Sequence, residues 1–189
     1  ELFKAFVNDL TSQPDLYSNS GERLKLLSNQ LGEKVVIRRA GFIKHASNSV
    51  ITVYNHLGGK IAVLMESSVV PGKQNDPEIL NLLDNVAMQI AANKPLSVSR
   101  ESLPYDLVQK KTAFYEEEVK FKPEQVRTKI LDGKMTKWYS EVVLLEQDAI
   151  FVGDNGPKGQ TVQKEIDKFG SNGLVVIKQF VRYERGEMV

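Results

Sequence analysis

The order of elements along this 189-residue chain predicts an α+β fold built around an antiparallel sheet. Apolar residues recur at helical spacing before residue 32 and again between residues 76 and 145, whereas β-branched runs cluster between residues 35 and 65. One further β-branched run follows the last helices, near the C-terminus. Because the helices come as a group instead of alternating singly with strands, a parallel βαβ sheet is excluded.

The first elements are predicted to be two amphipathic helices. Residues 2–10 carry apolar side chains on one side, and Pro14 follows as a breaker. A second helix is expected from about Ser20, which can cap it, to residue 31, where Gly32 provides a stop.

Three strands are then expected in succession, over residues 35–37, 49–54 and 60–65. Residues 55–59 contain paired glycines and suit a hairpin loop, because glycine tolerates positive φ. Three consecutive strands imply an antiparallel meander. The last strand, residues 174–183, must return to that sheet or pair elsewhere, which gives three to four strands.

The central region predicts several helices. Asp76 and Pro77 open the clearest one, whose apolar stripe is Ile79, Leu82, Leu83, Val86 and Ile90. Two more are expected over residues 104–119 and 124–146, with a break or kink at Gly133, because glycine costs about 1 kcal/mol inside a helix. A short helix is expected near Thr161, after a turn-rich loop at residues 153–159.

Composition narrows the class of protein. With 25 basic and 24 acidic residues, the net charge of +1 gives no sign of a globally basic nucleic-acid binder. No cysteine is present, which excludes disulfides, thiol catalysis and cysteine-ligated metals built from this chain and fits a reducing compartment. The longest apolar run, residues 61–65, is far shorter than a membrane span.

The residues show no recognisable catalytic or metal-binding pattern. The two histidines, His45 and His56, are too few for a zinc site, and no nucleophile-elbow motif occurs. His56 fits either a polar loop residue or a contact residue. The basic cluster between Lys120 and Lys137 fits either a solvated helix face or an RNA contact. This inventory favours a binding module over an enzyme.

Five segments, in order along the chain, resemble the elongation factor Ts family. The first is Gly32-Glu-Lys-Val-Val-Ile-Arg38-Arg39, and the second is Tyr54-Asn-His56-Leu-Gly58-Gly59-Lys60-Ile-Ala-Val-Leu64. The others are Val86-Ala-Met88-Gln89-Ile-Ala-Ala-Asn-Lys-Pro95, then Lys129 to Trp138 with Glu141 to Gln147, and finally Phe180-Val-Arg-Tyr-Glu-Arg-Gly-Glu187. Each segment alone is weak, but five in the family's order make chance an unlikely source.

The resemblance implies a division of the chain into three parts. Residues 1–33 would be helices left from a truncated N-terminal half-core. Residues 34–99 and 146–189 would form the C-terminal half-core with the antiparallel sheet, and residues 100–145 would form a protruding helical hairpin that serves dimerisation or docking. Met88 and Trp138 are expected in the core.

The resemblance also implies a function, that of a guanine-nucleotide exchange factor for elongation factor Tu, without enzymatic chemistry. It implies that four residues contact the partner, namely His56, Gly58, Gly59 and Lys60. Arg38 and Arg39 would either present positive charge to the partner or only solvate a strand. We expect no cofactor, no metal, no membrane association and no direct binding of nucleic acid. A homodimer is one possible oligomeric state. The expected location is a bacterial-type cytoplasm, with an organelle as the alternative. The rival function is a ribosome-associated RNA-binding protein that uses the Lys120–Lys137 cluster.

Two departures from the family pattern limit what is carried over. Gln89 stands where the family usually has a second histidine, so no role is assigned to it. The family's Thr-Asp-Phe-Val motif, which reaches toward the partner's magnesium and nucleotide, does not occur in the 189 residues. Because the chain begins at Glu1 without a methionine, we expect it to be cut from a longer protein. The fragment is then expected to keep docking but to exchange nucleotide poorly.

Overall fold

The structure divides the chain into two units, residues Glu1–Phe42 and Ile43–Val189. It is a computed structural model that describes residues 21–44, 46, 49–152, 159–169 and 173–187. The helix predicted over residues 2–10 and most of the turn-rich loop at residues 153–159 lie outside the described residues. The predicted three-part division of the chain stays a prediction.

The first unit contains helix α2, Gly21–Leu31, close to where a helix was predicted. Gly32 follows it with a φ of +71°, and the Val35 N–H then donates to the Ser28 hydroxyl at 2.9 Å, so the chain turns back onto the helix. The strand predicted over residues 35–37 is wrong, because this segment has no regular secondary structure. A β-branched run favours a strand only on a half-buried pleated surface, and Val36 is 52% exposed.

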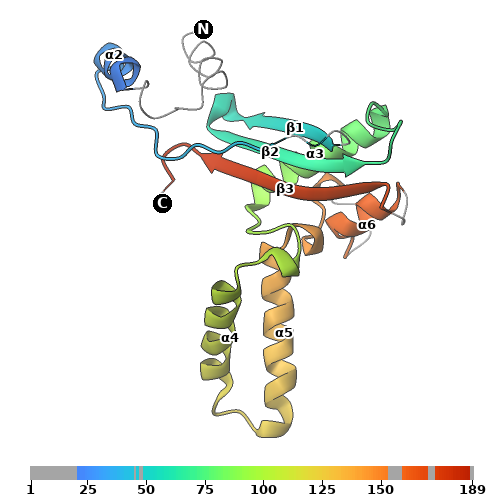
Figure 1. Cartoon of the computed structure of the whole chain (residues 1–189). Helices are drawn as coiled ribbons and strands as arrows, with labels where there is room; N and C mark the ends of the chain where they lie inside the picture. Colours follow the sequence, from blue (N-terminus) through green and yellow to red (C-terminus); the bar gives the residue numbers. More distant parts are fainter. Residues whose placement is uncertain (1–20, 45, 47–48, 153–158, 170–172, 188–189) are drawn as a thin grey trace. The chain divides into compact units, whose positions relative to one another are not determined.

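The second unit is organised around a three-stranded antiparallel sheet in the order β1-β2-β3 (Figure 1). Strands β1, Ser49–His56, and β2, Ile61–Val69, form the predicted hairpin. Strand β3, Val175–Glu184, returns from the far end of the sequence and pairs with β2, which confirms the α+β class. The register shifts at a bulge between Glu66 and Ser67.

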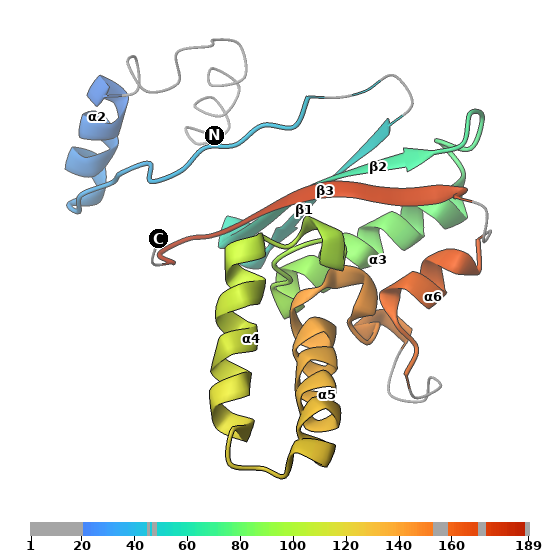
Figure 2. The same ribbon diagram turned by 60° about the horizontal axis from the view of Figure 1, so that its bottom comes forward.

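One face of this sheet is covered by helix α3, Pro77–Asn93, which both views show lying along the strands (Figures 1 and 2). The predicted cap is confirmed: the Asp76 carboxylate accepts a hydrogen bond from the Glu78 N–H at 3.1 Å. The predicted stripe is buried against Val63 and Met65 of β2. The short helix α6, Val162–Asp167, is capped by Thr161 and adds Val162 and Ile166 to the same core.

A pair of helices, here called the arm, extends away from the sheet (Figure 2). It consists of α4, Tyr105–Val119, and α5, Glu124–Val142, and follows the 3₁₀ turn η2, Arg100–Ser102. The predicted break at Gly133 is wrong, because α5 runs through it uninterrupted. Helix α5 also stops before residue 146, and the 3₁₀ turns η3, Leu144–Glu146, and η4, Ile150–Val152, follow. Trp138 is buried as predicted, whereas Met88 is only partly buried.

Candidate functional site

The end of the β1–β2 hairpin brings together four of the six residues that the sequence singled out. His56 is the last residue of β1 and pairs with Ile61, so it belongs to the strand and not to the loop. The connection is the 3₁₀ turn η1, Leu57–Gly59, closed by a hydrogen bond of 3.3 Å from the Lys60 N–H to the Leu57 carbonyl. His56, Gly58, Gly59 and Lys60 are all exposed.

The backbone of this turn explains why two glycines stand there. Leu57, Gly58 and Gly59 have φ values of +49°, +65° and +87°, in the left-handed region that favours glycine. A Cβ at either glycine would meet no atom within 4 Å, so backbone conformation requires glycine here and packing does not. Turn geometry alone therefore accounts for both glycines, and their role in partner contact stays a prediction.

The ring of His56 is held by Tyr54, its neighbour on the same face of β1. The Tyr54 hydroxyl lies 3.2 Å from His56 Nδ1, and the two rings stack at 6.1 Å with an interplanar angle of 19°. When the tyrosine donates this hydrogen bond, Nδ1 is the acceptor and Nε2 carries the proton. The ring then presents a donor to the surroundings in a fixed orientation.

A cluster of charges occupies the same end of the sheet, because Ile61 pairs with His56 on one side and with Glu184 on the other. Glu184 accepts hydrogen bonds of 2.9 Å from Lys94 and from Arg182, and these bonds lower its pKa to about 2. Arg182 also donates to the Ala91 carbonyl at 3.2 Å. Lys94 caps the C-terminus of α3, where the helix dipole favours a cation.

Arg38 and Arg39, the other two predicted residues, belong to the first unit. Both side chains are exposed, and both lie in a segment without regular secondary structure. Their assignment to the partner surface stays a prediction.

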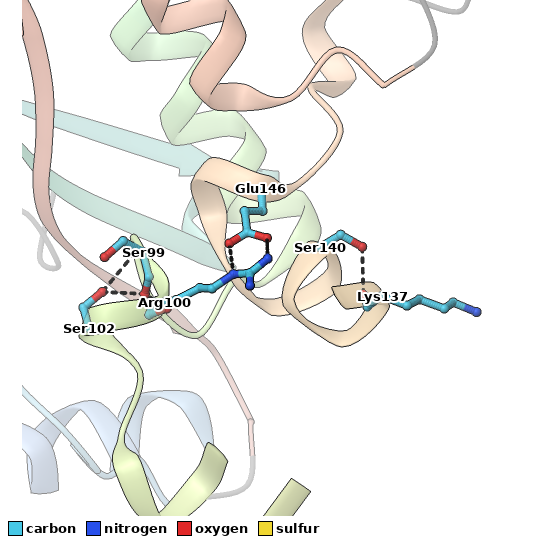
Figure 3. A network of polar contacts seen from close by, with 7 residues as sticks. Ser99, Arg100, Ser102, Lys137, Ser140 and Glu146 are labelled. Atoms are coloured by element: carbon cyan, nitrogen blue, oxygen red, sulfur yellow. Dashed lines mark hydrogen bonds and ion pairs between the residues drawn. The ribbon is translucent and has the colours of Figure 1, made fainter. Parts of the chain in front are cut away.

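The base of the arm is held by a second polar network (Figure 3). Arg100 donates from Nε and Nη2 to the two carboxylate oxygens of Glu146, at 2.5 and 2.6 Å, and its guanidinium lies 4.2 Å from the centre of the Tyr139 ring. The bonds to Glu146 raise the pKa of Arg100. Backbone hydrogen bonds from Leu96 to Val142 and from Leu144 to Ser97 join the two ends of the arm. The arm is therefore fixed where it enters and leaves the sheet-bearing part of the unit.

Sequence reasoning missed a buried pair of glutamines behind this base. Gln89 Nε2 donates to the Gln147 side chain and to the Asp148 carbonyl, both at 3.1 Å, and Gln89 Oε1 accepts from the Ile150 N–H at 2.9 Å. Gln147 donates onward to the carbonyls of Asn93 and Glu141. The available signal was the position of Gln89 between Val86 and Ile90 on the apolar stripe, where an unpaired amide would be costly.

The arm itself gives little support for an RNA-binding face. Between residues 105 and 142, eight basic residues alternate with seven acidic ones. Lys120 pairs with Glu117, Lys134 pairs with Glu118 at 2.9 Å, and Arg127 donates to the carbonyls of Lys120 and Lys122. Half of the predicted cluster is thus engaged within the arm.

Two other kinds of feature are absent from the described residues. No group of three or more histidine, aspartate or glutamate residues there could hold a metal ion. No helix in this part of the chain is long and apolar enough to cross a membrane.

The fold defines an α+β protein in which a helical arm projects from a three-stranded antiparallel sheet. The chain matches the family model "Elongation factor TS" over residues 5–187 and belongs to the elongation factor Ts family, which confirms the resemblance found in the sequence.

Relatives from several bacteria agree with this assignment. Elongation factor Ts of Chloroherpeton thalassium is 35% identical over 168 residues, and that of Nautilia profundicola is 33% identical over 170 residues. Each alignment covers 88% of this chain, which spans 55% and 54% of those two relatives, or about half their length. The factor of Thermotoga maritima is 33% identical over 188 residues, which cover 99% of this chain and 92% of the relative.

Proposed function

We propose that this chain acts in translation elongation as a guanine-nucleotide exchange factor for elongation factor Tu. It promotes GDP release by binding the nucleotide-free form of that G protein. Membership in the elongation factor Ts family supports a role as a translation elongation factor. The observation that carries the finer proposal is the exposed hairpin end, where His56 and Lys60 flank a turn of fixed conformation.

The proposed mechanism is thermodynamic. Suppose that a protein binds the empty G protein more tightly than the nucleotide-bound form by a certain ratio. It must then weaken nucleotide binding by the same ratio, because the two binding equilibria are linked. No bond of a substrate is made or broken, so we propose that the protein is not an enzyme and needs no cofactor. The cytoplasm, where translation proceeds in bacteria, is the proposed location.

Each predicted residue has a proposed part in docking. His56, oriented by Tyr54, donates a hydrogen bond to the partner from Nε2. The two glycines have no side chain, so the partner can approach the backbone of the turn closely. Lys60, Arg38 and Arg39 contribute positive charge, which speeds association with an acidic surface more than it strengthens the complex. The arm serves docking or self-association.

Titration calorimetry of the 189-residue chain against nucleotide-free elongation factor Tu tests the proposal. We expect saturable binding. His56→Ala should weaken it about tenfold, or ~1.4 kcal/mol, because the hydrogen bond that His56 donates to the partner and the contact of its ring with the partner are lost. Asn81→Ala, which changes an exposed residue of helix α3 outside the proposed contact surfaces, is the matched control and should bind like the parent. Absence of binding heat under conditions where a longer relative responds would contradict the proposal.

The rate of exchange is a separate measurement. Because the 189 residues contain no Thr-Asp-Phe-Val motif, we expect the chain to bind the partner but to release a fluorescent guanine nucleotide slowly in stopped flow. Rapid release by this chain alone would show that the motif is dispensable. Salt-dependent RNA binding that is lost on Lys122→Ala and Lys129→Ala would instead favour the rival function.

A further inference from the structure

Leu57 adopts a backbone conformation that the fold does not need from a leucine. Among the described residues, only Leu57 and Lys94 have positive φ without being glycine, both at +49°. Lys94 has a structural reason, because it ends α3 in the left-handed conformation and its N–H bonds to the Ile90 carbonyl. Leu57 begins a hairpin turn, where asparagine or glycine would take the same conformation with less strain.

The side chain of Leu57 gains nothing from packing either. It is 67% exposed and belongs to neither of the two hydrophobic clusters. The two residues after it are glycines, so Leu57 is the one apolar side chain of the turn, with His56 before it and Lys60 after it. A strained backbone that carries an exposed apolar side chain lowers the stability of the free protein, which points to a role outside folding.

We infer that Leu57 is the apolar anchor of the hairpin end and inserts into an apolar pocket on the partner G protein, beside acidic groups that face Lys60. The inference rests on the proposed function and names a contact that the sequence comparison with the family did not. Charge supports the acidic rim, because Lys60 is exposed and forms no ion pair among the described residues, so its ammonium is open to a partner.

The turn is also rigid enough to act as an anchor. The pairing of His56 with Ile61 fixes its base, and the hydrogen bond from Lys60 to the Leu57 carbonyl closes it. Because the backbone of the turn is already fixed, binding of the leucine does not have to order a loop, so a single leucine can contribute a large share of the affinity.

The decisive experiment measures stability and affinity on the same variants. Leu57→Asn removes the apolar side chain and suits the left-handed conformation, Leu57→Ala removes the side chain only, and Leu57→Met keeps an apolar side chain of similar volume. We expect Leu57→Asn to unfold in urea at the parent's midpoint or above it. Its affinity for nucleotide-free elongation factor Tu, measured by calorimetry, should fall at least tenfold.

The other variants separate the possible explanations. Leu57→Ala should also lose at least tenfold in affinity, and Leu57→Met should stay within threefold of the parent. Leu96→Asn, which alters another exposed leucine, is the matched control and should bind normally. Lys60→Glu should slow association most strongly at low salt, as expected for an acidic rim.

Three outcomes would overturn the inference. If Leu57→Asn and Leu57→Ala bind within twofold of the parent, the leucine is no anchor, although the proposed function stands. If Leu57→Asn unfolds at a clearly lower urea concentration, the leucine has a structural role in the turn. If the parent itself does not bind, the proposed function fails and the inference fails with it.

Discussion

The sheet-bearing core and the arm of the second unit are built on different principles. Helix α3 buries eight of its 17 residues, whereas α5 buries only Trp138 among 19 residues, and α4 buries only Val119 among 15. Helices in proteins gain most of their stability from packing, and the arm has much less of it than α3. The arm depends on the small cluster of Leu103, Trp138 and Val143 and on the polar contacts at its base.

This difference teaches where the molecule can change without unfolding. The core is sensitive to volume, since its side chains interlock at the density of a crystal. The arm exposes most of its residues, so its surface can vary while the base keeps its place. We therefore expect core substitutions to lower the stability of the whole second unit, and substitutions on the exposed arm to leave that stability almost unchanged.

The largest expected effect is a cavity beneath the sheet. Leu83→Ala removes a fully buried side chain of α3 and should lower the free energy of unfolding by about 2–5 kcal/mol, measured by urea denaturation. Val126→Ala on the arm, where the valine is 43% exposed, is the control and should change stability by less than about 0.5 kcal/mol. Equal losses in the two variants would show that core and arm do not differ in this way.

The core was predictable from the sequence because its signals are local and agree with one another. Asp76, Pro77 and the apolar stripe all indicate α3, and the hairpin follows from two β-branched runs joined by glycines. The strand expected at residues 35–37 failed because β-propensity describes fit to a sheet, and in the described part of the chain that segment is not paired in one. That β3 joins β2 could not be chosen from the sequence, since pairing across more than 100 residues leaves no local signal.

The candidate site was predictable in part. The resemblance located His56, Gly58, Gly59 and Lys60, and the structure gathers them at one hairpin end. It did not single out Leu57, because an unusual φ cannot be read from residue types when leucine occupies a position that favours glycine. The expected break at Gly133 failed because about 1 kcal/mol of lost propensity is small beside the remaining contacts of a 19-residue helix.

A second substitution tests how core and arm are joined. Gln89→Leu removes the hydrogen bonds to Gln147, Asp148 and Ile150 and leaves buried polar groups unpaired. Because each such group costs about 1–3 kcal/mol, we expect a loss of about 2 kcal/mol in urea denaturation. Amide exchange at Ile150 should also become faster.

The matched control for this substitution is Gln125→Leu, which places the same change on the exposed surface of α5. It should leave both the unfolding midpoint and the exchange rates unaltered. Unchanged stability in Gln89→Leu would mean that the base of the arm is held by Arg100, Glu146 and the backbone contacts alone.

The smallest expected effect concerns the charges at the end of the sheet. The pKa of Glu184 falls from 4.5 to about 2 in the folded protein, first through the hydrogen bond from Lys94 and then through that from Arg182. A carboxylate whose pKa is lowered by folding stabilises the protein above the unfolded pKa, and this contribution is lost as the pH falls toward the folded pKa. The parent should therefore lose stability between about pH 4.5 and pH 2 through this group.

Urea midpoints measured across that pH window check this effect, when the parent is compared with variants of the charge cluster. Glu184→Gln should show a weaker fall than the parent, and Lys94→Gln should lie between them, because Arg182 still bonds to the carboxylate. Since these side chains are near the surface, high salt should reduce the difference. If the urea midpoints of the parent and of Glu184→Gln changed with pH in parallel, the charge cluster at the end of the sheet would contribute no more to stability than the exposed charges of the arm.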